Sequence, residues 1–122
     1  MKILLTGANG YIGTRLLPVL LEQGHEVVCM VRDKRRFTAE SDFESQVTII
    51  EADLLKPDSL NNIPAGIDAA YYLVHSMSSG GAEFSEQEFE SAMHFVKAIQ
   101  KTSCRQIIYL TGIVNDEDLS KH

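Results

Sequence analysis

The sequence feature that most constrains the fold is a glycine-rich segment, TGANGYIG, at residues 6–13. It follows a short apolar run at residues 2–6, which predicts a buried strand. It opens the stretch 11–23, which predicts a helix that Gly24 ends. Pro18 predicts a kink in this helix rather than a break, because the apolar periodicity continues past it. The apolar face of the helix is predicted to consist of Ile12, Leu16, Val19 and Leu20.

A glycine-rich loop between a strand and a helix is typical of sites that hold the phosphates of nucleotides. Gly7 can turn the chain sharply, Gly10 lets backbone amides approach a pyrophosphate, and Gly13 lets the helix pack tightly on the sheet. The start of the helix then offers unpaired N–H groups and a partial positive charge. A purely structural tight turn is the alternative. The loop lacks the Gly-Lys-Ser/Thr ending of a phosphate-transferring P-loop.

Short apolar runs alternate with helical stretches along the rest of the chain. The runs that predict strands cover residues 2–6, 26–31, 47–51, 68–74 and 106–111. A short helix is expected near Pro57–Asn61, and residues 84–101 predict an amphipathic helix with the apolar stripe Phe89, Ala92, Met93, Val96 and Ile99. This alternation predicts a parallel sheet with helices on both faces. The expected fold is α/β, a Rossmann-type three-layer αβα sandwich with five strands in the order 3-2-1-4-5.

Composition excludes several classes of protein. The 122 residues suit one soluble domain, and no apolar run approaches the length of a membrane span. A net charge of −6 argues against nucleic acid or an anionic membrane as the main partner. The start of the chain does not read as a signal peptide. Cys29 and Cys104 have no metal or redox spacing, so we expect buried free thiols and a cytoplasmic protein.

Four stretches together carry a resemblance to a known superfamily. They are the T-G-x-x-G-x-x-G motif and the segments HEVVCMVRD (25–33), ADLL (52–55) and YYLVHSM (71–77). The chain resembles atypical and extended short-chain dehydrogenases/reductases, and within them NmrA-like, nucleoside-diphosphate-sugar epimerase-like NAD(P)-binding proteins. The resemblance runs from Met1 to about Gly112. It implies a dinucleotide cofactor, held at the loop by Gly7, Asn9, Gly10, Tyr11, Ile12 and Gly13.

The residue after the second strand bears on which dinucleotide binds. An NAD-selective site usually has an acidic side chain at the end of that strand, where this chain has Val31 and then Arg32. A guanidinium can hold a 2′-phosphate, so the sequence favours NADP(H), with Arg32 first and Arg35 or Arg36 in support. Asp33 leaves NAD(H) possible. Together with Lys34, these three arginines form a basic cluster. A solvated turn is the alternative for at least one of the residues Lys34–Arg36.

The resemblance assigns further contacts. Asp53 and Leu54 would meet the adenine, with the Asp53 carboxylate accepting from its exocyclic amine. Leu73, Val74 and His75 would line the path to the nicotinamide, which agrees with the binding of ligands beyond the carboxyl ends of parallel strands.

The sequence names two candidate catalytic residues. His75 could act as an acid or base, although a histidine bonded to the backbone is at least as good an interpretation. Thr111 falls near the Ser/Thr position that polarises a substrate carbonyl in the resembled superfamily, or it simply ends a strand. No Tyr-x-x-x-Lys follows it. The histidines share no metal-ligand spacing, and the glutamates at 83, 86, 88 and 90 indicate a solvated first helical turn rather than a metal site.

Two classes of function remain. The first is an NADP(H)-dependent oxidoreductase or epimerase-like enzyme acting on a small carbonyl or alcohol substrate. The second is a non-catalytic sensor or regulator that binds NADP(H). The 84–101 helix could form a homodimer face, although covering the sheet also explains its apolar stripe. We expect residues 1–122 to form an NAD(P)-binding domain at the N-terminus of a longer protein.

Overall fold

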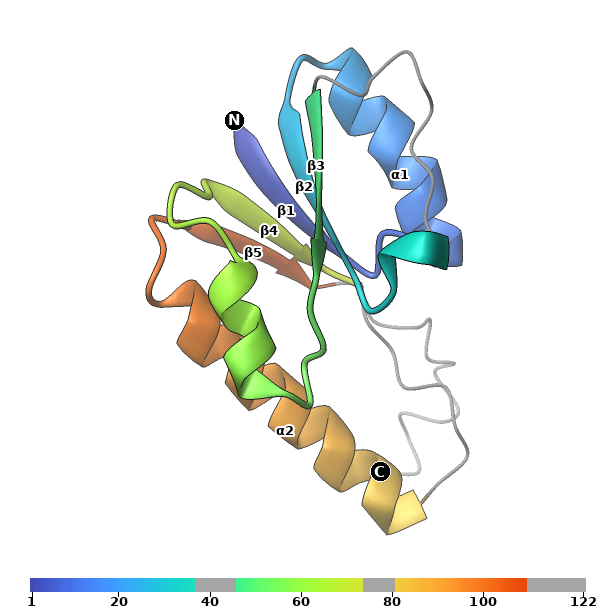
Figure 1. The fold of residues 1–122 in the computed structure, drawn as a ribbon, viewed down its shortest axis with the longest axis vertical. Helices are drawn as coiled ribbons and strands as arrows, with labels where there is room; N and C mark the ends of the chain where they lie inside the picture. Colours follow the sequence, from blue (N-terminus) through green and yellow to red (C-terminus); the bar gives the residue numbers. More distant parts are fainter. Residues whose placement is uncertain (37–45, 74–80, 110–122) are drawn as a thin grey trace, which may run out of the picture.

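The fold is a five-stranded parallel sheet between helical layers (Figure 1). The computed structural model describes residues 1–36, 46–73 and 81–109, without the side chains of Arg36 and of residues 81–85. The strands are β1 (Lys2–Thr6), β2 (Glu26–Val31), β3 (Val47–Glu51), β4 (Ala69–Tyr72) and β5 (Gln106–Tyr109). Every pair is parallel and the order is β3-β2-β1-β4-β5, which confirms the predicted arrangement.

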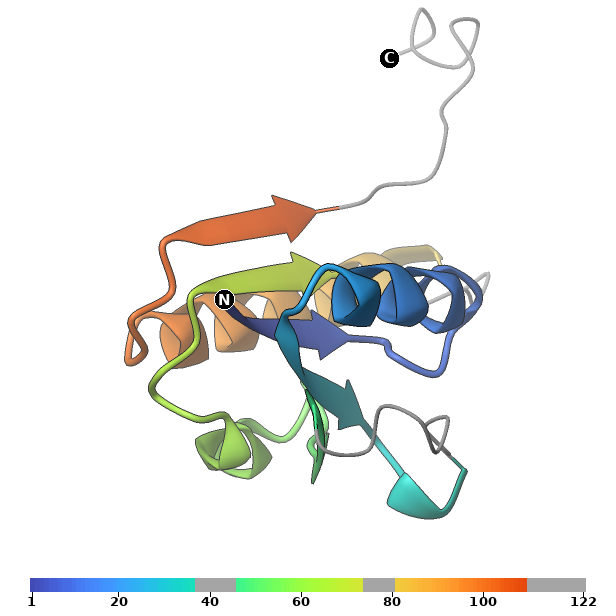
Figure 2. The ribbon, with the colours of Figure 1, turned by 90° about the horizontal axis from the view of Figure 1, so that it is seen from above.

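Two α-helices and two 3₁₀ helices complete the described structure. They are α1 (Tyr11–Glu22), η1 (Lys34–Arg36), η3 (Pro57–Asn62) and α2 (Gly81–Ile99). Side chains alternate across the buried strands, so Ile3 and Leu5 pack with α1 while Leu4 packs with η3 and α2. Figure 2 shows the sheet between these layers. The carboxyl ends of the strands, η1 and the start of α1 lie at the same edge.

The buried face of α1 differs from the predicted one. Ile12 and Val19 are 49% and 47% exposed, so their assignment to the core face is wrong. The buried residues are Gly13, Leu17, Leu20 and Leu21. The helix continues through Pro18 to Glu22, and the chain then turns at Gly24, whose φ is +87°.

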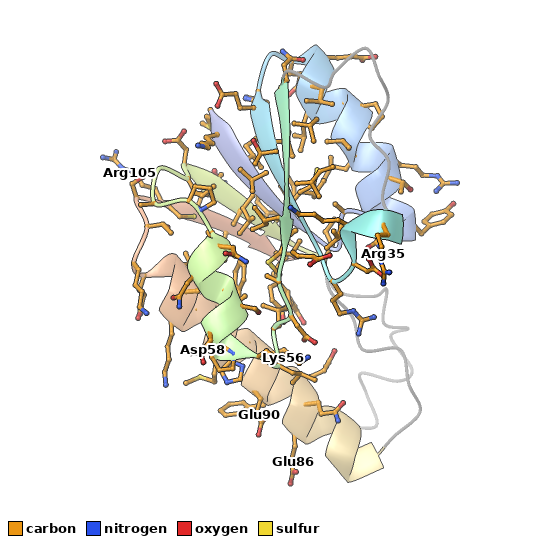
Figure 3. All side chains as sticks on the ribbon, in the orientation of Figure 1. Arg35, Lys56, Asp58, Glu86, Glu90 and Arg105 are labelled. Atoms are coloured by element: carbon orange, nitrogen blue, oxygen red, sulfur yellow. The ribbon has the colours of Figure 1, made fainter. Side chains whose placement is uncertain are left out.

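The predicted stripe of α2 is also mostly wrong. Phe89, Met93 and Val96 are exposed, whereas Phe95 and Ile99 are buried. Phe95 meets the ring of Tyr72 edge-on, with the ring centroids 4.8 Å apart, and this contact helps to fix which face of the helix covers the sheet. The helix begins at Gly81, earlier than predicted. Glu86 and Glu90 are exposed and point away from the sheet in Figure 3.

The two cysteines have different environments. Cys29 is fully buried against α1, and this burial raises the pKa of its thiol to about 12. Cys104 is only half-buried and its Sγ donates to the carbonyl oxygen of Gln106, so the expectation that both thiols are buried is wrong for Cys104. None of the described helices has both the length and the hydrophobicity of a membrane-spanning segment, and no group of potential ligands among the described residues suits a metal ion.

Candidate functional site

The glycine loop connects β1 to α1 through backbone contacts that leave little space for side chains. Gly7 has a φ of +65°, and a Cβ on it would lie 3.4 Å from the backbone of Leu73. The N–H of Gly10 donates to the carbonyl oxygen of Gly7 over 2.9 Å. A Cβ on Gly13 would lie 2.3 Å from that same oxygen. Gly13 therefore lets α1 pack against the loop backbone, whereas the sequence suggested packing against the sheet.

The start of α1 is open to a ligand. The first helical bond runs from the N–H of Thr14 to the carbonyl oxygen of Gly10, so the N–H groups of Tyr11, Ile12 and Gly13 have no carbonyl partner within the helix. Asn9, Gly10, Tyr11 and Ile12 are exposed, and the first turn contains no acidic side chain. The positive end of the helix dipole is therefore available for an anion.

Thr6 fastens this loop to β4, a role that the sequence interpretation missed. Its hydroxyl is fully buried, donates to the carbonyl oxygen of Tyr71 over 2.8 Å and accepts from the N–H of Leu73 over 3.1 Å. A small hydroxyl residue at the end of a buried strand was the only signal available. Leu73 itself is buried with the core on the α1 side of the sheet, directly beside Gly7.

The basic cluster after β2 is divided in its roles. Arg35 forms a bidentate pair with Asp33 through Nε to Oδ1 (3.1 Å) and Nη2 to Oδ2 (3.2 Å). The guanidinium of Arg32 is exposed and has no hydrogen-bond or ion-pair partner among the described residues. Figure 3 places Arg35 at the η1 edge of the sheet, far from Arg105 at the opposite edge. Among the described arginine side chains of this cluster, the guanidinium of Arg32 is therefore the one that has no partner.

The loop after β3 is held from two other elements. The N–H of Asp53 donates to Ser59 Oγ over 2.8 Å, and Asp53 Oδ1 accepts from the N–H of Leu55 over 2.9 Å. The carbonyl oxygen of Leu54 accepts a hydrogen bond from His94 Nδ1. The side chain of Leu54 is buried in the core on the α2 side, so only its backbone could meet a ligand at this edge.

Several predicted site residues fall outside the described residues. They are Val74, His75 and Thr111, together with the side chain of Arg36. The structure therefore brings the glycine loop, Arg32, Asp53 and Leu73 to the carboxyl edge of the sheet. The two candidate catalytic residues stay predictions.

The described part of this edge suits a dinucleotide. The loop has no room for a Cβ at Gly13 and little at Gly10, so the backbone itself forms the cradle. Unpaired N–H groups and an uncommitted arginine offer partners to phosphate groups. A family model described as NAD(P)H-binding matches residues 7–122. The chain belongs to this NAD(P)H-binding family.

Individual relatives agree with this assignment. The chain is 23% identical over 111 residues to the photosystem II assembly factor Ycf39 of Synechocystis sp., covering 91% of this chain and 33% of the relative. It is 26% identical over 117 residues to a 3-beta-hydroxysteroid dehydrogenase of Mycolicibacterium neoaurum, covering 88% and 31%. It thus spans about a third of the length of these relatives.

A solved structure shows the same fold. A nucleoside-diphosphate-sugar epimerase from Staphylococcus aureus superposes with a TM-score of 0.71 at 21% identity, over 89% of this chain and 37% of the epimerase. This match and the family assignment confirm the resemblance to the dehydrogenase/reductase and epimerase-like proteins. They leave the choice between NAD(H) and NADP(H) open.

Proposed function

We propose that this chain is the cofactor-binding part of an NADP(H)-dependent oxidoreductase or epimerase-like enzyme that acts on a small carbonyl or alcohol compound. The observation that carries the NADP(H) preference is the contrast between the two charged side chains after β2. The carboxylate of Asp33 is engaged by Arg35, and the guanidinium of Arg32 is exposed without a partner among the described residues. This combination favours a 2′-phosphate over a bare ribose hydroxyl pair.

Different residues along the carboxyl edge of the sheet bind different parts of the cofactor. The N–H groups at the start of α1 bind the pyrophosphate, and Arg32 binds the 2′-phosphate. Asp53 accepts from the exocyclic amine of the adenine through its carboxylate. Thr6 keeps the ends of β1 and β4 together beneath the cofactor. The bound nicotinamide supplies hydride transfer. We also assign His75 and Thr111 to the substrate side, as the residues to test first for acid–base chemistry.

A titration with NADPH and NADH, followed by fluorescence, tests this proposal. The full chain should bind NADPH more tightly than NADH. Arg32→Asp should weaken NADPH at least tenfold and NADH less than about threefold, because only NADPH loses charge-assisted hydrogen bonds that contribute about 1.5–3 kcal/mol. Arg105→Asp is the matched control, since Arg105 is exposed at the opposite edge of the sheet (Figure 3). It should change neither affinity by more than about twofold.

Two results would contradict the proposal in different ways. If neither dinucleotide binds, the cofactor-binding role of the loop is wrong. If Arg32→Asp weakens NADPH and NADH equally, the cofactor site stands and the role of Arg32 in 2′-phosphate binding is wrong.

A second candidate is a non-catalytic NADP(H)-binding regulator. The observation that favours it is the similarity to Ycf39, a relative whose name describes an assembly factor rather than an enzyme. The two candidates differ in turnover. An enzyme consumes NADPH when a panel of small ketones and aldehydes is added, whereas a regulator binds NADPH with the same affinity and leaves it unchanged.

A homodimer and a cytoplasmic location stay predictions. The exposed residues Phe89, Met93 and Val96 of α2 are the first surface to substitute in a test of dimerisation. Light scattering of the full chain gives the oligomeric state directly.

A further inference from the structure

His94 of α2 makes a contact that packing of the helix on the sheet does not require. Its Nδ1 lies within hydrogen-bond distance of the carbonyl oxygen of Leu54, 40 residues earlier in the chain. A carbonyl oxygen can only accept, so Nδ1 carries the proton in this contact. The imidazole is half-buried. It therefore ties α2 to the loop that follows β3.

The peptide unit that receives this hydrogen bond also contacts Asp53. The carbonyl of Leu54 and the N–H of Leu55 belong to one planar unit. The carbonyl oxygen accepts from His94, and the N–H donates to Asp53 Oδ1 over 2.9 Å. Rotation of this plane would break both contacts together. His94 is thus linked through one rigid peptide to the orientation of the Asp53 carboxylate.

Other contacts hold the loop without fixing that plane. Ser59 Oγ accepts from the N–H of Asp53 and lies 3.0 Å from its carbonyl oxygen, which fixes the preceding peptide and the start of the turn. The buried side chain of Leu54 anchors the Cα position. A peptide plane can still turn between anchored Cα atoms. Among the described residues, the hydrogen bond from His94 is the contact from another element that opposes rotation of the Leu54–Leu55 peptide.

The surroundings of His94 increase the importance of the hydrogen bond. A cavity of about 250 Å³ lies between η3 and α2, and His94 forms part of its wall together with Leu60, Ile63 and Ala98. The imidazole of His94 is therefore not enclosed by close packing on its η3 side.

We propose that His94 is a positioning residue for adenine recognition, which acts through the Leu54–Leu55 peptide to orient the carboxylate of Asp53. Asp53 Oδ1 is occupied by the N–H of Leu55, and Oδ2 has no partner among the described residues. The fixed peptide thereby directs Oδ2 toward the exocyclic amine of the base. This inference rests on the proposed function, since it requires that Asp53 contacts the adenine.

Three substitutions of His94 distinguish a role of its hydrogen bond to Leu54 from a purely steric role of its side chain. The amide nitrogen of an asparagine lies as many bonds from the backbone as Nδ1 does, so His94→Asn keeps the donor in place. A glutamine carries its amide one bond farther out, and a leucine has no donor. His94→Gln and His94→Leu should weaken NADPH about three- to tenfold, the effect of one lost hydrogen bond, while His94→Asn stays within about twofold of the original protein.

A modified cofactor distinguishes positioning from general damage. Reduced nicotinamide hypoxanthine dinucleotide phosphate has a carbonyl where NADPH has the exocyclic amine, so it lacks the group that Asp53 recognises. His94→Leu should leave its affinity within about twofold while weakening NADPH. In an Asp53→Ala background, His94→Leu should have no further effect on NADPH, because the two residues act through one contact. Equal weakening of both cofactors, or additive losses in the double variant, would overturn the proposal.

A measurement without cofactor tests the peptide link itself. Amide hydrogen exchange at Leu55 should become several-fold faster in His94→Leu and His94→Gln, and should be unchanged in His94→Asn. Unchanged exchange in all three variants would overturn the inference even if NADPH binds. Binding of neither dinucleotide by the original protein would instead overturn the proposed function, so the two failures can be told apart.

Discussion

Replacement of Gly13 by alanine tests whether α1 is positioned by its contact with the loop backbone. A Cβ at Gly13 would lie 2.3 Å from the carbonyl oxygen of Gly7 and 2.9 Å from the Cα and the carbonyl oxygen of Ala8. A carbon and a carbonyl oxygen rarely approach closer than about 3.3 Å, so α1 has to move by about 1 Å. All of the opposing atoms are backbone, and no side-chain rotation can relieve the overlap.

The size of the effect follows from two opposing contributions. Alanine in a helix is favoured over glycine by up to about 1 kcal/mol. Overpacking a well-packed site costs about 1–3 kcal/mol, and the upper end applies where only backbone can move. We therefore expect Gly13→Ala to lower the free energy of unfolding by about 2 kcal/mol. A shift of about 1 Å at the start of α1 should also misplace its N–H groups and weaken NADPH at least tenfold.

Gly66→Ala is the matched control for this change. A Cβ on Gly66 meets no atom within 4 Å, and its φ is not in the left-handed region. This substitution should therefore stabilise the protein by up to about 1 kcal/mol by restricting the unfolded chain. Urea denaturation of both variants, followed by circular dichroism, gives the two free energies. If Gly13→Ala is as stable as Gly66→Ala, the steric account of the loop is refuted.

Two further predictions concern buried polar groups of the sheet. Thr6→Val should lower the free energy of unfolding by about 1–3 kcal/mol in urea denaturation, because it removes the acceptor for the N–H of Leu73, and Thr6→Ser should cost much less. Burial raises the pKa of Cys29 to about 12 from 9.0, so the folded state binds more protons than the unfolded state between these pH values. The free energy of unfolding should therefore fall as the pH rises from 9 toward 12, and it should fall less steeply in Cys29→Ala; equal slopes would contradict the role of this thiol.

The strands were predictable because they are short, apolar and bounded by turn residues. The ranges 2–6, 26–31 and 47–51 agree with β1, β2 and β3, and their order followed from the alternation of strands and helices. In parallel strands buried on both faces, a continuous apolar run is itself the signal. No choice of face is needed for such a strand.

The helix faces were not predictable because both helices carry more apolar residues than one face needs. In α1 the contact of Gly13 with the loop sets the rotation of the helix about its axis, and Leu17 and Leu20 then lie on the same side as Gly13. In α2 Phe95 packs on Tyr72, while Phe89 and Met93 remain exposed. Periodicity gives the existence of an apolar face, but a tertiary contact selects it.

The residues of the candidate site also fall into two groups, those that the local sequence predicts and those that it does not. Local sequence indicated the glycine loop and Arg32, since these residues act through their own backbone and charge. The roles of Thr6 and His94 depend on partners 67 and 40 residues away, which no local pattern specifies. The ion pair between Asp33 and Arg35 was also missed. The two residues lie only two positions apart, but the sequence does not specify which of several nearby charged side chains meet.

The three glycines of the loop do not carry equal evidence for a cofactor. Gly7 is required by its φ of +65°, which residues with a side chain rarely adopt, and Gly13 by the carbonyl oxygen of Gly7, so the fold demands both whatever binds there. Gly10 is exposed, has an extended backbone with a φ of −83° and would bring a Cβ to 3.2 Å from only one atom. A Cβ at Gly10 would therefore require the carbonyl oxygen of Gly7 to shift by only a few tenths of an ångström, a smaller conflict than the one at Gly13. The steric reason for glycine is thus weaker at Gly10 than at Gly13, and the proposed approach of a pyrophosphate to the start of α1 would supply a second reason.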